Sequence, residues 1–328
     1  MSPDLSPWRG DNLTERSHFR RVKMPAAEQL DLFADNRRTI WLNQAHEALG
    51  CLDLEGALAS YGRIVEAGLD DREIRYERDL AVGWRERLTR YGESERDAGQ
   101  LHEMYLELSP ATPTPLMIAL LELMVEEIST LESPELLFFP PRFHPGLLCC
   151  VLGRYGEGEK WFTRALDAGI QPAGRFLAYR GDTLFILGSP EPARELYKGA
   201  FLEGPLTVDM PHLADPALSE LISYGESEAE EPDDLLPWLP VWGWLRNLFT
   251  LELDELRRDL SGFLDSLTRG ETGKVLTAPQ LWFQYLRYAE FLRGVPGYGQ
   301  ELVRARRRLK EINDELFGRY MRKIAGGE

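Results

Sequence analysis

The sequence has little of what disulfide-bonded, exported or membrane-spanning proteins need. Three cysteines in 328 residues give no disulfide framework and no CxxC spacing. The first 30 residues lack the apolar core of a signal peptide. The longest apolar stretch, residues 116–125, contains Glu122 and is far shorter than the roughly 20 residues that cross a bilayer. We therefore expect a cytoplasmic protein with free thiols and no membrane partner.

Basic residues are also scarce, with 38 Lys and Arg against 54 Asp and Glu and a net charge of −16. Proteins that bind nucleic acid or anionic membranes broadly need a basic surface, because phosphate charge dominates those affinities. No direct nucleic-acid binding is therefore predicted. The hydrophobic fraction of 43% is enough to build a continuous core, which argues against a disordered chain.

Motifs that carry chemistry are missing as well. None of the five histidines pairs with another at metal-ligand spacing, and residues 270–274 lack the first glycine and the Ser or Thr of a phosphate loop. No GxSxG occurs. We expect no metal, no cofactor and no catalysis, with one alternative left open: an enzyme whose site is assembled from distant residues.

What the sequence does contain is small residues at equal intervals between residues 142 and 205. Gly146 precedes Gly158 by 12 positions, and Gly181 precedes Ala193 by the same interval. An aromatic residue follows four positions later and an alanine three after that, at Phe162, Ala165, Tyr197 and Ala200. A repeat of 35 residues cannot bury its apolar face alone, so it predicts a stack of helical hairpins.

These residues resemble the tetratricopeptide repeat (TPR), a helix–turn–helix unit with a small residue in each helix where the two cross. Helix axes approach to roughly 8 Å only where side chains are small. The resemblance implies an all-α fold, an α-solenoid of stacked antiparallel helical hairpins. Pro205 fits the proline that ends the unit, whereas Gly158 replaces the usual alanine and Ile170 stands where the earlier copy needs its proline.

Further hairpins are expected on the N-terminal side of this pair. A third unit has its turn near Asp53 and its closing cap at Gly68. It carries the same pattern at Trp41, Ala45, Leu49, Ala57, Tyr61 and Ile64. Residues 72–108 predict a looser, degenerate hairpin, and residues 116–131 an apolar helix.

The chain divides into four predicted parts. Residues 1–34 form a flexible N-terminal arm, 35–207 the TPR-like repeat region, 208–237 a Pro-rich acidic connection, and 238–328 C-terminal hairpins that continue or cap the stack. Prolines and like charges oppose helix in the connection, apart from a short helix near residues 217–224. Its acidic run is interpreted as a solvated loop, with a docking site for a basic partner as the alternative.

The C-terminal part has two notable clusters. Trp238, Trp242 and Trp244 are interpreted as core, with an exposed aromatic patch as the alternative. A last helix over residues 297–323 is predicted to cap the stack, and its arginines around residues 304–310 form either a solvated face or a partner contact.

The arm contains Gln29, Leu30, Asp31, Leu32 and Phe33. This stretch resembles the pentapeptide by which bacterial replication and repair proteins dock on the DNA sliding clamp. The resemblance implies that Gln29 hydrogen-bonds at the mouth of a groove while Leu32 and Phe33 fill an apolar pocket. The alternative is a strap whose apolar side chains cover the exposed end of the stack.

In a TPR stack the first helices of the hairpins line a concave groove, so their outward positions are the predicted site. The candidate groove residues are Asn43, His46, His144, Arg175, Tyr179 and Asp182. TPR proteins that hold a peptide's C-terminal carboxylate use a Lys, Asn and Arg set on this face. Here Ala178 and Asp182 accompany Arg175, so that specificity is not expected.

Two functions follow as hypotheses. The first is a non-catalytic cytoplasmic scaffold or adaptor that binds a segment of a protein partner in the groove. The second is an accessory factor of bacterial DNA replication or repair that the sliding clamp recruits through Gln29–Phe33. Neither the partner, the pathway nor the oligomeric state follows from the sequence.

Overall fold

The computed structural model describes residues 26–92, 97–110, 112–228, 232–258, 262 and 276–326, with the backbone alone for some of them, including residues 26–35 and 232–234. Helices dominate this part of the chain, and it contains no strand beyond one isolated bridge between Phe139 and Phe143. The predicted all-α class is therefore confirmed. The chain divides into two compact units, residues 1–148 and 149–328, and each is described by itself.

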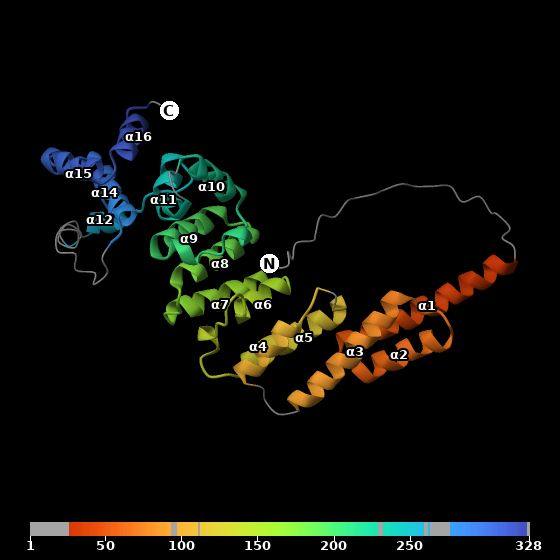
Figure 1. The fold of residues 1–328 in the computed structure, drawn as a ribbon. Helices are drawn as coiled ribbons and strands as arrows, with labels where there is room; N and C mark the ends of the chain where they lie inside the picture. Colours follow the sequence, from red (N-terminus) through yellow and green to blue (C-terminus); the bar gives the residue numbers. More distant parts are fainter. Residues whose placement is uncertain are drawn as a thin grey trace. The chain divides into compact units, whose positions relative to one another are not determined.

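The helices of the first unit, labelled in Figure 1, begin with a closely packed pair, α1 (Ala26–Gly50) and α2 (Leu54–Glu66). Asp53 caps α2 by accepting a hydrogen bond from the Gly56 amide at 2.9 Å, and Gly68 ends it with φ of +66°, a backbone conformation that favours glycine. The predicted crossing residues Ala45, Leu49, Ala57, Tyr61 and Ile64 are fully buried.

The remaining helices of the first unit pair differently from the prediction. These are α3 (Arg72–Tyr91), α4 (Ala98–Glu107), α5 (Thr114–Ile128) and the 3₁₀ turn η1 (Pro134–Leu136). The predicted hairpin of α3 with α4 is joined by the Arg87–Glu107 ion pair, but α3 packs mainly on α2, and α4 packs on α5, which also returns to α1. The reason is that α5 buries seven residues spread around its surface, so one partner cannot cover it.

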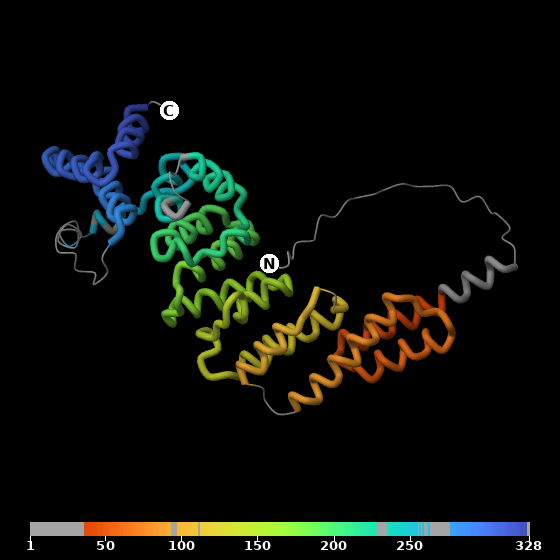
Figure 2. Tube along the Cα trace, in the orientation of Figure 1, coloured from red at the N-terminus to blue at the C-terminus, as the bar shows by residue number. Residues whose placement is uncertain are grey.

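Helix α6 (Pro145–Val151) contains the boundary between the units, and three consecutive helices open the second: α7 (Tyr155–Asp167), α8 (Ala173–Ile186) and α9 (Pro190–Glu203). Figure 2 shows these helices following one another along the chain. A Cβ added at Gly181 would lie 2.8 Å from the Tyr197 ring, closer than side chains pack. Helices α8 and α9 thus approach closely at Gly181, but the atoms nearest to it belong to the Tyr197 ring and not to the predicted Ala193. Ala193 and Ala200 are fully buried in the same pair.

Residues after α9 contain more helix than the prolines predict. Two short turns, η2 (Pro205–Thr207) and η3 (Met210–His212), lead to α10 (Pro216–Glu228) and α11 (Pro232–Leu245). Helix α11 begins before the predicted end of the connection and includes Pro237 and Pro240. Burial offsets the hydrogen bonds that the prolines remove, because Leu235, Leu239 and Val241 lie in the core of the unit.

In the described residues from 251 onward, the second unit contains α12 (Asp254–Arg258), α14 (Ala278–Arg293), α15 (Gly299–Ile312) and α16 (Asp314–Ile324). Helix α11 packs against α9, α10, α14 and α16 and forms the centre of the core. The predicted single helix over 297–323 is wrong, because Asn313 breaks it and caps α16 by accepting from the Leu316 amide at 2.9 Å. The Trp282 indole N–H binds the Leu309 carbonyl at the end of α15 at 3.1 Å.

Candidate functional site: a basic and aromatic cleft

The predicted groove residues of α8 face a segment of their own chain. The Arg175 guanidinium donates to the Thr207 carbonyl at 2.9 Å, and the Tyr179 hydroxyl lies 3.4 Å from an Asp209 carboxylate oxygen. Asp182 accepts from the Tyr197 hydroxyl at 2.7 Å and from the Ala214 amide at 2.8 Å. Residues 207–214 thus follow this face of α8 and bind its polar groups.

The N-terminal groove candidates are Asn43 and His46, both on α1. Asn43 is exposed, whereas His46 Nε2 lies 2.9 Å from the Glu77 carboxylate, which also accepts a hydrogen bond from the Tyr61 hydroxyl at 2.9 Å. The hydrogen bonds from His46 and Tyr61 lower the pKa of Glu77 against the effect of burial. Burial, with the Glu77 charge added, raises the pKa of Tyr61. This cluster ties α1 and α2 to α3.

His144 is not on an outward face, contrary to the prediction. Its side chain is fully buried, where it caps α6. Nδ1 accepts from the Gly146 amide at 3.0 Å, so the ring proton is on Nε2, which donates to the Glu135 carbonyl at 3.3 Å. Burial lowers the pKa of His144 to about 4. An imidazole held neutral by its surroundings serves the fold and has no free face for a partner.

The clamp-like peptide, Gln29–Phe33, falls within the backbone range of α1, which begins at Ala26. The side chains of these residues lie outside the described part of the structure, so the predicted roles of Gln29, Leu32 and Phe33 stay predictions.

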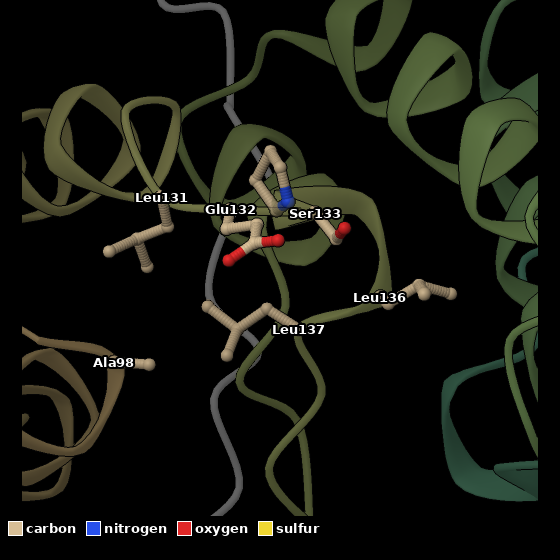
Figure 3. Close-up of a pocket in the computed structure, with 7 residues that line it drawn as sticks. Ala98, Leu131, Glu132, Ser133, Leu136 and Leu137 are labelled. Carbon is tan, nitrogen blue, oxygen red and sulfur yellow. The ribbon is translucent and has the colours of Figure 1, made fainter.

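A small hollow of about 360 Å³ occurs in the first unit, between the start of α4 and the segment after α5. Figure 3 shows Ala98, Leu131 and Leu137 around it, with the Glu132 carboxylate and Ser133 nearby. Its lining is mostly apolar and its one charged group is acidic, so it offers little to fix the orientation of a ligand.

The second unit holds a larger cleft of about 860 Å³ that is open to solvent. Its walls come from α10, from the C-terminal half of α11 with the turn after it, from α14, and from α16. Cations and aromatic rings dominate the lining: Arg246, Arg293, Arg319, Arg322, Lys323, Tyr224, Trp242 and Trp244, with Glu290 as the one carboxylate. We call this the basic–aromatic cleft. None of its residues is among the sequence-predicted groove or clamp residues.

Two guanidinium groups lie over aromatic rings in this cleft. The Arg246 guanidinium carbon is 4.4 Å from the centre of the Tyr224 ring, and that of Arg319 is 4.8 Å from Trp242. The two rings meet edge to face with centroids 5.7 Å apart. Such cation–π contacts contribute about 0.5 to 1 kcal/mol each at exposed sites. They hold two planar guanidinium groups in defined orientations along one wall.

Helix α16 contributes three cations to the cleft. Arg319, Arg322 and Lys323 are three and four residues apart, which places them on one face of the helix. Arg319 donates to the Tyr224 hydroxyl and to Glu315, both at 2.8 Å. Lys323 donates to the Leu245 carbonyl at the end of α11 and lies 5.1 Å from the Trp244 ring centre.

The floor of the cleft contains its one carboxylate, Glu290 on α14. It accepts from the Tyr320 hydroxyl at 3.0 Å and pairs with Arg293 at 2.7 Å. Burial, more than the nearby Glu290 charge, raises the pKa of Tyr320 to about 12. Arg293 is thus paired with Glu290 and Arg319 with Glu315, and Arg246, Arg322 and Lys323 provide the excess positive charge of the cleft.

The sequence contained one signal for this site, the clustered tryptophans, of which Trp242 and Trp244 line it. The basic cluster noted around residues 304–310 does not line the cleft, whose cations on α16 are Arg319, Arg322 and Lys323. Trp242 and Trp244 are buried, as the core interpretation predicts, although both residues line the cleft. Arg319 and Tyr224 are 95 residues apart, and only the packing of α16 on α11 brings them together.

Among the residues that the structure describes, no group of three or more His, Cys, Asp or Glu side chains could hold a metal ion. No helix in the same described ranges is long and apolar enough to cross a bilayer. The three cysteines are free thiols, as expected; Cys149 is buried, Cys150 is partly exposed and Cys51 is exposed.

Comparison with known proteins gives this chain no family. No protein-family model matches the sequence, and no significant match was found among curated proteins or solved structures.

Proposed function

We propose that this chain is a non-catalytic adaptor that binds a segment of a protein partner in the basic–aromatic cleft. The observation that carries the proposal is the combination of an open cleft of about 860 Å³ with Trp, Tyr and Arg side chains in its lining. These three residue types carry most of the binding energy in protein–protein interfaces. Their positions on four packed helices give a rigid surface, which reduces the entropy lost on binding.

The proposal moves the binding site away from the α8 face that the sequence favours. Residues 207–214 already bind the polar groups of Arg175, Tyr179 and Asp182 there. A partner would have to replace these bonds, whereas Arg246 and Arg322 in the cleft are exposed. The cleft is therefore the surface where binding costs the fold least.

We also propose that the helices form a TPR-like stack. A TPR-like stack is supported by small residues at the crossing of α8 with α9, where Gly181 meets the Tyr197 ring and Ala193 is fully buried. The matching positions of α1 and α2, Ala45 and Ala57, are also fully buried. A cytoplasmic location is supported by the free cysteines, which are typical of a reducing compartment.

Site-specific photo-crosslinking tests the adaptor function. A benzophenone amino acid replaces Ile324, which lines the cleft, and in a control protein it replaces Val303, an exposed apolar residue of α15 outside the lining. We expect a protein partner to crosslink from position 324 in the source cells and not from position 303. Equal crosslinking from both positions, or none from 324, would contradict the proposal.

A second candidate function is recruitment to a bacterial sliding clamp, and the observation that favours it is the full pentapeptide Gln29–Phe33. A clamp-binding peptide acts by burying apolar side chains, so the acidic charge of the chain is no obstacle. The test mixes purified clamp with the native chain and with a Gln29→Ala, Phe33→Ala variant. Binding that is absent, or equal in both proteins, removes this candidate.

A further inference from the structure

The charge of the basic–aromatic cleft is opposite to that of the whole chain. The lining contains five Lys or Arg side chains and one carboxylate, although the chain carries a net charge of −16. Residues 287–323 contain ten Lys or Arg and five Asp or Glu. A concave surface lined by one sign of charge concentrates ligands of the other sign. The ligand of this cleft should therefore be anionic.

The arginines of the cleft offer planar sets of donors that suit a carboxylate. The Arg246 guanidinium lies over the Tyr224 ring and Arg319 over Trp242, so the planar groups are held before a ligand arrives. The N–H groups of Arg319 already bind Tyr224 and Glu315, whereas Arg246 is exposed, and the N–H edge of a guanidinium matches a carboxylate in a bidentate pair. Arg322 adds an exposed guanidinium one turn along α16 from Arg319.

The same contacts disfavour nucleic acid. Proteins that bind single strands stack bases on open aromatic faces. Here Arg246 and Arg319 cover faces of Tyr224 and Trp242, and Trp242 and Trp244 are 7% and 9% exposed. The favoured occupant is thus a protein segment with Asp or Glu side chains.

We infer that the basic–aromatic cleft binds an acidic segment of the partner protein, with Arg246 and Arg322 pairing with its carboxylates and Arg319 fixing the wall between them. The inference rests on the adaptor function proposed above and names the chemical class of the partner. Apolar side chains of the same segment would contact Leu245 and Ile324, which also line the cleft.

Fluorescence anisotropy with the full chain tests this inference. The probe is a fluorescein-labelled peptide that alternates glutamate with leucine, and its isostere has glutamine in place of every glutamate. We expect the glutamate peptide to bind the native chain at least about tenfold more tightly than the glutamine peptide, since one good charge-assisted pair accounts for that factor. Added salt should weaken the binding, because the pairs are open to solvent.

Two double variants with the same change in net charge locate the effect. Arg246→Gln, Arg322→Gln removes cations from the cleft, whereas Arg304→Gln, Arg307→Gln removes exposed cations from α15 outside the lining. We expect about a tenfold or larger loss of affinity for the first and less than about a twofold change for the second. Circular dichroism of both variants checks that the helices are intact.

Several results would overturn the inference. These are no binding of the glutamate peptide, equal binding of the glutamine peptide, an equal loss in both double variants, or preferential binding of a single-stranded oligonucleotide. A phosphopeptide that binds while the glutamate peptide does not would also overturn it. If the partner crosslinked from position 324 docks through a segment without acids, the acidic specificity fails but the adaptor function stands. No crosslink from that position removes the adaptor function itself.

Discussion

The α8 face and the basic–aromatic cleft both contain arginine and aromatic side chains, but the two surfaces differ in the partners that these side chains bind. On α8, Arg175, Tyr179 and Asp182 bind residues 207–214 of their own chain. In the cleft, arginines lie on aromatic rings and two of them, Arg246 and Arg322, are exposed. Both surfaces lie in the second unit, so they share one core.

This difference separates stability from binding. A polar group that is buried with its partner costs stability when the partner is removed, because the desolvated group is left unpaired. An exposed charge costs little when it is removed, since water already solvates it. Changes on α8 should therefore affect the folding of the second unit, and changes in the cleft should affect its ligand.

The largest expected effect is at the α8–α9 crossing. Gly181→Leu would push a side chain into the Tyr197 ring, which already lies 2.8 Å from the position of an added Cβ. Overpacking of this kind should lower the free energy of unfolding by about 3 kcal/mol. Urea denaturation followed by circular dichroism measures it.

The matched control for that variant is Gly156→Ala on α7, where an added Cβ meets nothing within 4 Å. It should raise stability by about 0.5 to 1 kcal/mol, because alanine favours helix over glycine. If Gly181→Leu proves as harmless as Gly156→Ala, the close approach of α8 and α9 is not present in solution.

Asp182→Ala should destabilise the second unit almost as much. It removes the acceptor of both the fully buried Tyr197 hydroxyl and the Ala214 amide. Two unpaired donors should cost about 2 to 3 kcal/mol. A double-mutant cycle with Tyr197→Phe, measured by denaturation, gives the share that belongs to the hydroxyl. Purely additive losses would show that Asp182 and Tyr197 do not act as a pair.

The first unit extends the comparison through His144, a predicted groove residue that the fold also satisfies internally. Its pKa of about 4 is below the ordinary value of 6.5, so between these values the unfolded chain binds a proton that the folded chain does not. Stability is then fully present above pH 6.5 and is lost as pH falls toward 4. Between pH 6.5 and 5 the loss should be about 2 kcal/mol.

Thermal denaturation at several pH values, with His144→Asn beside the native chain, measures this term. Asparagine can also donate and accept hydrogen bonds but does not titrate, so the variant should lose less stability over the same pH interval. Parallel pH profiles for the two proteins would mean that His144 is not the group responsible.

The smallest effect on stability is expected in the cleft. Arg322→Gln removes an exposed charge and should change the free energy of unfolding by less than about 0.5 kcal/mol. The same variant should weaken binding of the acidic peptide, which anisotropy measures. A large loss of stability in Arg322→Gln would contradict the expected difference between the α8 face and the cleft.

Much of the local structure was predictable from residues close together in the sequence. Asp53 marks the start of α2 and Gly68 its end, and Gly181 marks the close approach of α8 to α9. Caps and small crossing residues act over short distances, so the sequence shows them. The prediction was wrong where neighbours in space decide the outcome. Pro237 and Pro240 sit inside α11, and Asn313 breaks the last helix.

The predicted site residues show the same limit. Helical spacing placed Arg175, Tyr179 and Asp182 on one face of α8, and the structure agrees that they act along one face. Spacing could not reveal that residues 207–214 occupy that face, or that His144 points inward. Both depend on how a later or earlier segment folds back, which a periodic pattern does not encode.

By itself the sequence determined that the protein is helical and where small residues let helices cross, because these properties depend on neighbours within a few turns. Only the tertiary structure decided that the α8 face binds residues of its own chain and that the basic–aromatic cleft is open to a ligand. It brings together Tyr224 of α10, Arg246 of the turn after α11 and Arg319 of α16. Their attraction depends on distance in space, and separation along the chain does not fix that distance.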